Sequence, residues 1–370
     1  MHINLFLIPF VIILGLLFSQ SNSKRSRQWY IIICSLVLMF VASMRHPVWM
    51  TETYGIDTQS YLYMFESTFD MSWSELMTEA YIRYFGVGGE SDVGYLVLNK
   101  IIGYFTHDFG VFSFIADFLF FYPFGLLLFR YTTNVRQLIF AFVFYISLIQ
   151  VFLLGGGRQM FAIGMDLMAL LAVIDRKKTR AIFLFLLGVT LHFSSFLFLV
   201  PLLMVWYDVK PKTIKQLHLL CFIVFPIVFL IPNQVISIMG GVAGVEKYAE
   251  YGKHALSGGS IVFIGIIELL SFFCLIAIKE KDMLLDKKIV YFYIMAPFFT
   301  FFAPLIRSNG TMIRIALYYY IFLSLLVPFS IDCYLKQSGN KSITYWGVIF
   351  ALALLTIITD NIEYYFYWQL

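Results

Sequence analysis

Hydrophobic residues gather along this chain in ten runs, each close to the length that a membrane-spanning helix needs. A span takes about 20 consecutive apolar residues, and several of these runs are slightly shorter. They occupy residues 3–20, 29–45, 111–129, 138–154, 158–174, 217–232, 260–278, 289–305, 313–331 and 343–360. The pattern predicts an all-α, polytopic integral membrane protein, a helical bundle of about ten spanning helices. The composition agrees, because 61% hydrophobic and 13% charged residues exclude a soluble domain.

The connections between the runs differ in charge, which predicts the side of the membrane on which each lies. Basic residues concentrate in 24–27, 130–136, 176–180, 210–215, 279–288 and 336–341, so these loops are expected in the cytoplasm. The remaining connections, 46–110, 155–158, 233–259 and 306–312, are then external, together with both termini. The net charge of +4 is scattered, so nucleic acid is not an expected partner.

One apolar segment, residues 181–206, lies between two loops that both carry cytoplasmic signals. Two full crossings need more than about 35 residues, so the segment is too short for them. We predict a re-entrant helical hairpin with its tip near residues 191–195, with a single crossing as the alternative. Residues 93–107 are short and are predicted at the outer interface. No internal repeat divides the chain, so residues 1–370 are predicted to form a single transmembrane domain with external loops 46–110 and 233–259.

Arg158 stands where two apolar runs meet, directly after Gly155-Gly156-Gly157. An arginine beside the hydrocarbon is costly, and on the outer side the positive-inside rule does not explain it. A helix that begins after glycines offers backbone N–H groups to an anion, although snorkelling toward lipid phosphates is the alternative. Arg314 opens a helix in a similar way. The two arginines together could hold one diphosphate, and Arg45 and Arg307 also lie at outer ends of spans.

The first external loop carries a carboxylate beside aromatic residues. Asp57-Thr58 is predicted to cap a helix that places Tyr61 and Phe65 on one face. The functional interpretation is an acid beside aromatic platforms for sugar rings. The alternative is a helix cap with an interfacial aromatic stripe. Further along, Asp92, Tyr95 and Asn99 supply another acid and an amide at the membrane surface.

His192 is the candidate general base, because histidine titrates near neutral pH and Ser194 and Ser195 flank it at the predicted hairpin tip. Its alternative role is that of a hydrogen-bonded packing residue. Asp166, two turns below Arg158, is predicted either to pair with an arginine or to line a polar cavity. In the second external loop, Lys247, Tyr248 and Tyr251 belong to a predicted short interfacial helix.

Five segments together give the chain a family resemblance. They are Gly55-Ile56-Asp57-Thr58-x-x-Tyr61, Asp92-x-Gly94-Tyr95, Arg158-Gln159 at a helix start, Leu191-His192-Phe193-Ser194, and the Arg314 to Tyr319 helix start. In this order and spacing the chain resembles the EpsG-type, Wzy-like polysaccharide polymerases over about residues 30–330. It departs from the family pattern at Ile56, where threonine is usual, and at Asp92, where the acid is often glutamate.

The resemblance implies an O-antigen or capsular polysaccharide polymerase with a GT-C-like architecture in the bacterial inner membrane. Such a glycosyltransferase transfers a growing glycan from undecaprenyl diphosphate onto a new lipid-linked repeat unit at the periplasmic face. It is expected to need no metal and no cofactor. Its expected partners are membrane lipid and, as a further candidate, a chain-length regulator protein. Arg158 and Arg314 would stabilise the leaving diphosphate, and His192 or Asp57 would act as the base. The predicted substrate contacts are Arg45, Thr58, Tyr61, Asp92, Tyr95, Asn99, Gln159, Ser194, Lys247, Tyr248, Tyr251, Arg307 and Tyr319.

Three other functions share parts of this pattern. An O-antigen ligase-like glycosyltransferase would hold the same diphosphate and differ in its acceptor. A flippase or transporter for lipid-linked glycan would show broken helices in matching halves, which the chain lacks. An acyltransferase would place a histidine at a cytoplasmic entry.

Overall fold

A computed structural model of the chain describes residues 2–45, 56–85, 92–154, 157–243, 260–308, 312–335, 341–359 and 366. These residues are helical almost throughout and contain no β-strand, since their one β-bridge is the isolated pair Arg45 and Phe366. The prediction of an all-α membrane protein is therefore confirmed. The chain divides into two compact units, 1–199 with 345–370 and 200–344, and each is described by itself.

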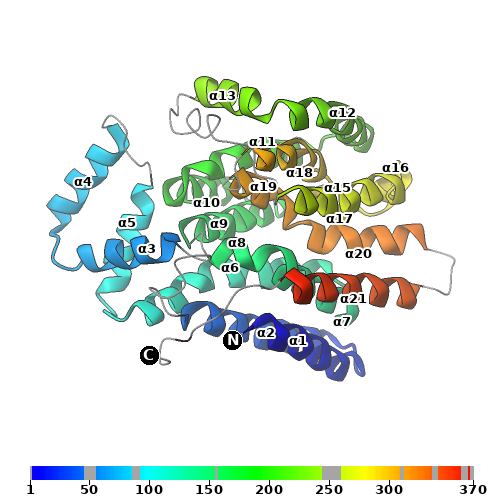
Figure 1. Ribbon diagram of the computed structural model, residues 1–370, viewed down its shortest axis with the longest axis horizontal. Coiled ribbons are helices and arrows are strands. Elements are labelled where there is room, and N and C mark those ends of the chain that lie inside the picture. The colour runs from blue at the N-terminus through cyan, green and yellow to red at the C-terminus, as the bar shows by residue number, and fades with distance from the viewer. Residues whose placement is uncertain are drawn as a thin grey trace. The chain divides into compact units, whose positions relative to one another are not determined.

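The first unit contains the N-terminal helices and most of the last one (Figure 1). Its elements are α1 (Asn4–Ser19), α2 (Lys24–Ser43), α3 (Ile56–Ser67), α4 (Trp73–Phe85), α5 (Val93–Gly103), α6 (Phe109–Tyr131), α7 (Val135–Phe144), the π-helix η1 (Tyr145–Ile149), α8 (Gln150–Leu154), α9 (Gly157–Ile174), α10 (Lys178–Leu191), the 3-10 helix η2 (Phe193–Phe198) and α21 (Lys341–Thr359). The second unit holds α11 (Leu199–Trp206), α12 (Pro211–Leu230), α13 (Pro232–Ala243), α15 (Ser260–Ala277), α16 (Glu280–Leu285), α17 (Lys287–Tyr293), α18 (Ala296–Phe302), the 3-10 helix η3 (Ala303–Arg307), α19 (Ile313–Tyr320) and α20 (Leu323–Tyr334).

Each of the ten predicted runs falls on one helix or on consecutive helices, and these differ in length. Six stretches of the described chain are long and apolar enough to cross a membrane: Lys24–Ser43, Phe109–Tyr131, Gly157–Ile174, Pro211–Leu230, Lys287–Arg307 and Lys341–Ile358. The pair α19 and α20, bent by 47°, makes a seventh if it is one span. The other three predicted spans are shorter apolar helices, Asn4–Ser19, Val135–Ile149 and Ile261–Ala277. The chain is a multi-pass helical membrane protein, and the count of ten spans stays a prediction.

Helix α9 is the packing centre of the first unit, lying between α6 and α10 (Figure 1). Gly164 permits the approach to α6, because a Cβ atom there would lie 2.0 Å from the carbonyl oxygen of Leu119. Small residues at helix contacts in membranes allow backbones to come this close. At the C-terminal ends of the same two helices, Arg130 binds Asp175 through two hydrogen bonds of 2.5 and 3.1 Å. Both ends therefore lie together, as their shared cytoplasmic prediction requires.

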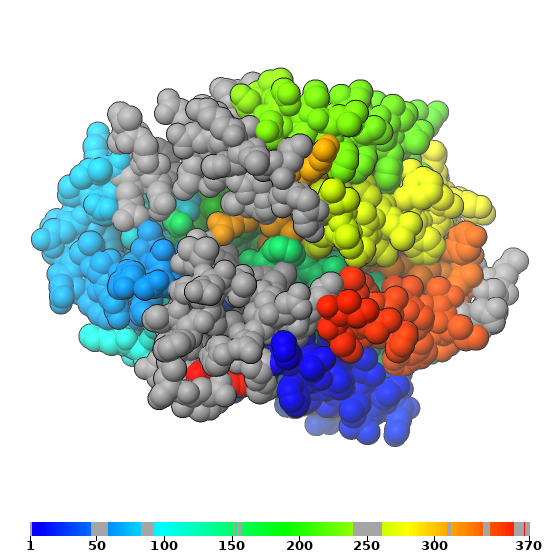
Figure 2. Space-filling model, in the orientation of Figure 1, coloured from blue at the N-terminus to red at the C-terminus, as the bar shows by residue number. Residues whose placement is uncertain are grey.

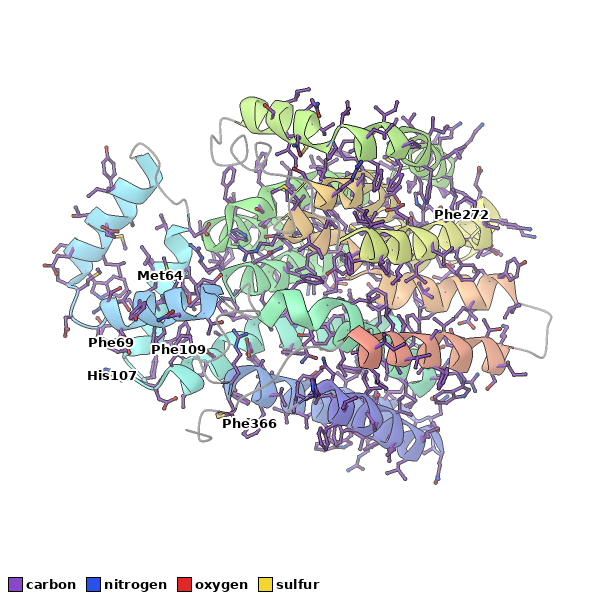
Figure 3. All side chains as sticks on the ribbon, viewed as in Figure 1. Met64, Phe69, His107, Phe109, Phe272 and Phe366 are labelled. Carbon is purple, nitrogen blue, oxygen red and sulfur yellow. The ribbon has the colours of Figure 1, made fainter. Side chains whose placement is uncertain are left out.

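Helices α3, α4 and α5 gather at one edge of the first unit, away from α1 (Figure 2). Lys100 on α5 donates hydrogen bonds of 2.9 Å to the carbonyl oxygens of Thr68 and Phe69 at the end of α3. The Phe69 ring stacks on His107 with 4.4 Å between ring centroids, and both labelled side chains are visible near Phe109 in Figure 3. These contacts hold the predicted interfacial segment against the end of α3.

The second unit is built around α12, α15 and α18, which enclose buried polar side chains. His218 forms hydrogen bonds of 2.8 Å with the hydroxyls of Tyr293 and Ser271, and Ser271 is 2.6 Å from the Thr300 hydroxyl. Lys215 donates to the carbonyl oxygens of Leu275 and Ile278 at the end of α15. Because buried polar groups need partners, these bonds fix the helices relative to one another.

The predicted hairpin segment breaks where the sequence places its tip. Helix α10 ends at Leu191, His192 has an extended backbone with φ −157° and ψ 118°, and η2 begins at Phe193. The return of both arms to the same side of the membrane stays a prediction. The single transmembrane domain also stays a prediction, because two compact units can belong to one membrane domain.

Candidate active site

Three charged or ionisable side chains from different helices meet in the first unit. Asp92 precedes α5, Arg158 is the second residue of α9, and His192 follows α10. The Arg158 Nη1 atom lies 3.1 Å from Asp92 Oδ2, and His192 Nδ1 lies 3.4 Å from the same oxygen. The latter distance is longer than a well-formed N–H···O hydrogen bond. Catalytic hydrogen bonds are often this long before substrate binds, so the Asp92–Arg158–His192 cluster is a candidate active site.

Asp92 occupies the N-cap position of α5 but does not cap that helix. Its side chain forms no capping hydrogen bond, and its Oδ1 atom instead accepts from the backbone N–H of Phe193 at 3.1 Å. An aspartate at an N-cap usually bonds to the first turn of its own helix. Here the carboxylate instead forms its hydrogen bond with the loop that carries His192.

Gly94 brings this carboxylate close to the histidine. A Cβ atom on Gly94 would lie 2.9 Å from the backbone carbonyl of Thr190, two residues before His192. Real Cβ atoms do not approach backbone that closely, so any side chain would push α5 away from α10. The absence of a side chain at Gly94 therefore sets the distance between Asp92 and His192.

A second contact, between two buried residues, fixes the loop that carries His192. The Ser195 hydroxyl donates to the Asp166 carboxylate and lies 2.8 and 2.7 Å from its two oxygens. Both residues are buried. The sequence left Asp166 either as an arginine partner or as a cavity-lining residue, and the structure gives it a serine instead. Asp166 thus ties α9 to η2, directly after His192.

Two tyrosines lie against the Arg158 guanidinium. Its Cζ atom is 5.5 Å from the Tyr61 ring centroid and 5.9 Å from that of Tyr95, distances typical of cation–π contacts. The tyrosine rings contact each other with centroids 5.5 Å apart. Gly157 leaves room for Tyr61, since a Cβ there would be 3.2 Å from the ring. Tyr61, on the predicted aromatic face of α3, is therefore turned toward Arg158.

The surroundings of Asp92 keep its carboxylate ionised. Burial is the largest influence and raises the pKa, but His192, Arg158 and the Phe193 N–H together outweigh it and lower the pKa below its ordinary value. An ionised Asp92 can hold the His192 ring in one tautomer and stabilise it when it gains a proton. The ring nitrogen that does not face Asp92, Nε2, is the one available to a substrate.

The remaining predicted residues of the first unit lie around the cluster in different ways. Thr58, Gln159, Ser194 and Asn99 are buried. The Asn99 amide lies beside the Tyr95 hydroxyl, yet neither of its polar atoms has hydrogen-bond geometry to any residue in the described ranges. The prediction that Asp57-Thr58 precedes its helix is wrong, because α3 begins at Ile56 and includes both in its first turn. The side chain of Asp57 lies outside the described residues.

The other predicted residues belong to the second unit or outside the described ranges. Arg307 donates 2.6 Å to the carbonyl oxygen of Phe229 and lies over its ring. Tyr319 is fully buried and stacks on Phe298 and Phe302. Arg314 is the second residue of α19, as the sequence predicts. Its pairing with Arg158 stays a prediction, since the two belong to different units. Lys247, Tyr248 and Tyr251 lie outside the described residues.

Sequence reasoning placed Asp92 and Arg158 near the outer surface and His192 at the tip of the predicted hairpin, but it did not join them. The sequence did contain one signal for the cluster, because all three residues stand at helix ends. That signal was not decisive, because residues so far apart in the sequence do not indicate which helix ends contact one another.

A comparison with known families decides the wider identity. The EpsG family model matches residues 28–368. The chain belongs to the EpsG family. It is thus a polysaccharide-polymerase-like membrane protein, and the cluster lies within the matched region. Neither curated proteins nor solved structures give a significant match to it.

Proposed function

We propose that this EpsG-family protein polymerises an O-antigen or capsular polysaccharide at the periplasmic face of the bacterial inner membrane. It would transfer a growing glycan from undecaprenyl diphosphate onto a new lipid-linked repeat unit. The observation that carries this proposal is the convergence of Asp92, Arg158 and His192. The three groups supply an orienting carboxylate, a cation and a base within one partly buried site.

The proposed step forms one bond and breaks one. The acceptor hydroxyl oxygen attacks the anomeric carbon of the donor glycan, and the bond from that carbon to the diphosphate oxygen breaks. Undecaprenyl diphosphate leaves with the bonding electron pair, and His192 Nε2 takes the hydroxyl proton. Asp92, facing Nδ1, stabilises the imidazolium that forms. His192 is therefore favoured over Asp57 as the base.

Arg158 is proposed to stabilise the charge that develops on the leaving diphosphate. The sequence predicts a diphosphate beside this arginine, and the structure supplies Asp92 as one internal partner. The guanidinium of arginine carries five N–H donors in a planar fork, so one arginine can bind a carboxylate and a phosphate together. Arg158 can thus hold Asp92 and a phosphate oxygen together. Arg314 is kept as a second diphosphate ligand on sequence grounds, and the transfer is proposed to need no metal, because the diphosphate is already an activated leaving group.

Reconstitution tests the proposal against its nearest alternatives. Purified protein in lipid nanodiscs, given lipid-linked repeat units, should yield a ladder of lipid-linked oligomers and free undecaprenyl diphosphate. Transfer to a lipid A core with no ladder would identify a ligase. Translocation of the repeat unit across proteoliposomes without any new glycosidic bond would identify a flippase and exclude the proposal.

A further inference from the structure

A small cavity adjoins the candidate active site inside the first unit. Its volume is about 30 Å³, and it lies among the outer ends of α2, α6 and α9 beside α3 and α5. The lining residues that matter here are Arg45, Tyr61, Tyr95, Ser113, Asp117 and Gly157. Tyr61 and Tyr95 are the same rings that contact the Arg158 guanidinium. The cavity and the Asp92–Arg158–His192 cluster therefore share a wall.

The lining of this cavity is unusual for the interior of a helix bundle. Asp117 lies within the apolar helix α6 and is buried, and it interacts electrostatically with Arg45 at the end of α2. Ionisable residues inside membrane helices are rare and generally face a polar path or a ligand. Ser113, one turn before Asp117 on the same helix, adds a hydroxyl. Acceptor and donor groups thus line the same cavity as aromatic rings.

That combination matches the chemistry of a sugar hydroxyl. A carboxylate accepts a hydrogen bond from the hydroxyl, a guanidinium donates one to it, and aromatic rings cover the C–H faces of the sugar. A volume of about 10–15 Å³ holds one water molecule, so the cavity accommodates about two water-sized groups. It is large enough for a hydroxyl-bearing arm and too small for a whole sugar ring.

We propose that this cavity binds a hydroxyl-bearing arm of the sugar next to the bond that is made. The inference rests on the proposed function, because it assumes a lipid-linked glycan at the cluster. The arm enters beside Tyr61 and Tyr95, and this fixes the sugar ring relative to His192 and Arg158. The cavity then selects which repeat unit is used, by binding rather than by chemistry.

The test compares two cavity variants with a matched control. Asp117→Asn replaces one carboxyl oxygen of the cavity with an amide nitrogen, and Ser113→Leu fills the cavity without changing an ionisable group, so one variant remains informative if the other fails to fold. Asp70→Asn makes the same acid-to-amide change at an exposed position. Each protein is checked for monodispersity, and kcat and KM are measured with lipid-linked repeat units. Binding of the repeat-unit oligosaccharide, released from its diphosphate, is measured separately by saturation-transfer NMR.

Loss of one hydrogen bond weakens binding by about threefold to tenfold. We therefore expect KM to rise by that factor in both cavity variants with kcat within about threefold, and the oligosaccharide signal to fall, while Asp70→Asn is unchanged. Wild-type polymerisation with unaltered KM and oligosaccharide binding in both variants would overturn the cavity proposal and leave the function standing. Oligosaccharide binding that depends on the cavity, without any polymer from the wild type, would support the cavity and refute the polymerase.

Discussion

Asp92 forms an ion pair with Arg158 at 3.1 Å and faces His192 at 3.4 Å through the same carboxylate oxygen. One partly buried acid therefore joins the start of α9 to the end of α10. This contact explains why an arginine is tolerated beside the hydrocarbon before any ligand binds, since a charge at that depth needs a partner. It also couples the base to the cation of the candidate site.

The Arg158→Gln variant should lose stability at a higher pH than the wild type. In the folded protein the pKa of Asp92 is lowered, so its carboxylate stabilises the fold above the ordinary value of 3.8, and that stability is lost as pH falls through the lower folded pKa. Without Arg158, burial weighs more heavily and the pKa rises. Thermal unfolding of the detergent-solubilised protein between pH 3 and 7 measures this. Superimposable pH profiles for the two proteins would show that Arg158 does not act on Asp92.

Replacing Gly94 with alanine should slow catalysis while the protein remains folded. The added Cβ would meet the Thr190 backbone, so α5 must move away from α10 and carry Asp92 away from His192. Gly265→Ala is the control, because a Cβ there meets nothing within 4 Å. We expect a fall in kcat of about tenfold to a hundredfold for the first variant, from a displacement of the order of 1 Å. Equal activity in both would mean that the close approach is not needed.

The Ser195→Ala variant tests the tie between α9 and the His192 loop. It leaves the buried Asp166 carboxylate without that hydroxyl, which should cost about 1–3 kcal/mol of stability. Ser330→Ala removes a buried hydroxyl that donates to the Leu326 carbonyl of its own helix and lies beside the Cys274 thiol. It leaves no carboxylate without a partner and should cost less. Denaturation of both variants gives the comparison. A larger loss for Ser330→Ala would remove Asp166 from the account of how the loop is held.

The hairpin prediction for residues 181–206 has its own labelling test. A Lys210→Cys protein in a Cys333→Ser background should resist an impermeant thiol reagent added from the periplasmic side. Cys34, Cys221 and Cys274 are buried, so these native cysteines should not react with the reagent. Ser72→Cys lies in the predicted external loop at an exposed position and should react. Labelling of position 210 from the outside would replace the hairpin by a single crossing.

The sequence was a good guide to the helices because apolar runs of membrane length have few other solutions. It also located the break at His192 and the helix starts at Arg158 and Arg314 correctly. It was less reliable for lengths and boundaries. The run at 138–154 is divided among α7, η1 and α8, and α3 begins at Ile56, before the residues predicted to cap it.

The site itself could be predicted only as a set of candidates. Asp92 was assigned to a substrate surface, whereas it is the residue that pairs with Arg158 and faces His192. Its N-cap position was misleading, since such a residue ordinarily serves its own helix. Gly94 and Gly164 likewise carry no local signal, because their importance comes from the helix packed against each. Tertiary contacts of this kind are not encoded in hydrophobic periodicity.

The most direct test of the central claim is the single-turnover rate of glycosidic bond formation with purified protein and lipid-linked repeat units. His192→Gln should reduce that rate by a factor of about 10²–10⁴, the usual contribution of a general base, with the protein still folded and binding substrate. Arg158→Lys should retain only part of the wild-type rate, because lysine lacks the planar fork. Wild-type turnover in His192→Gln would contradict the account and leave the histidine as a packing residue.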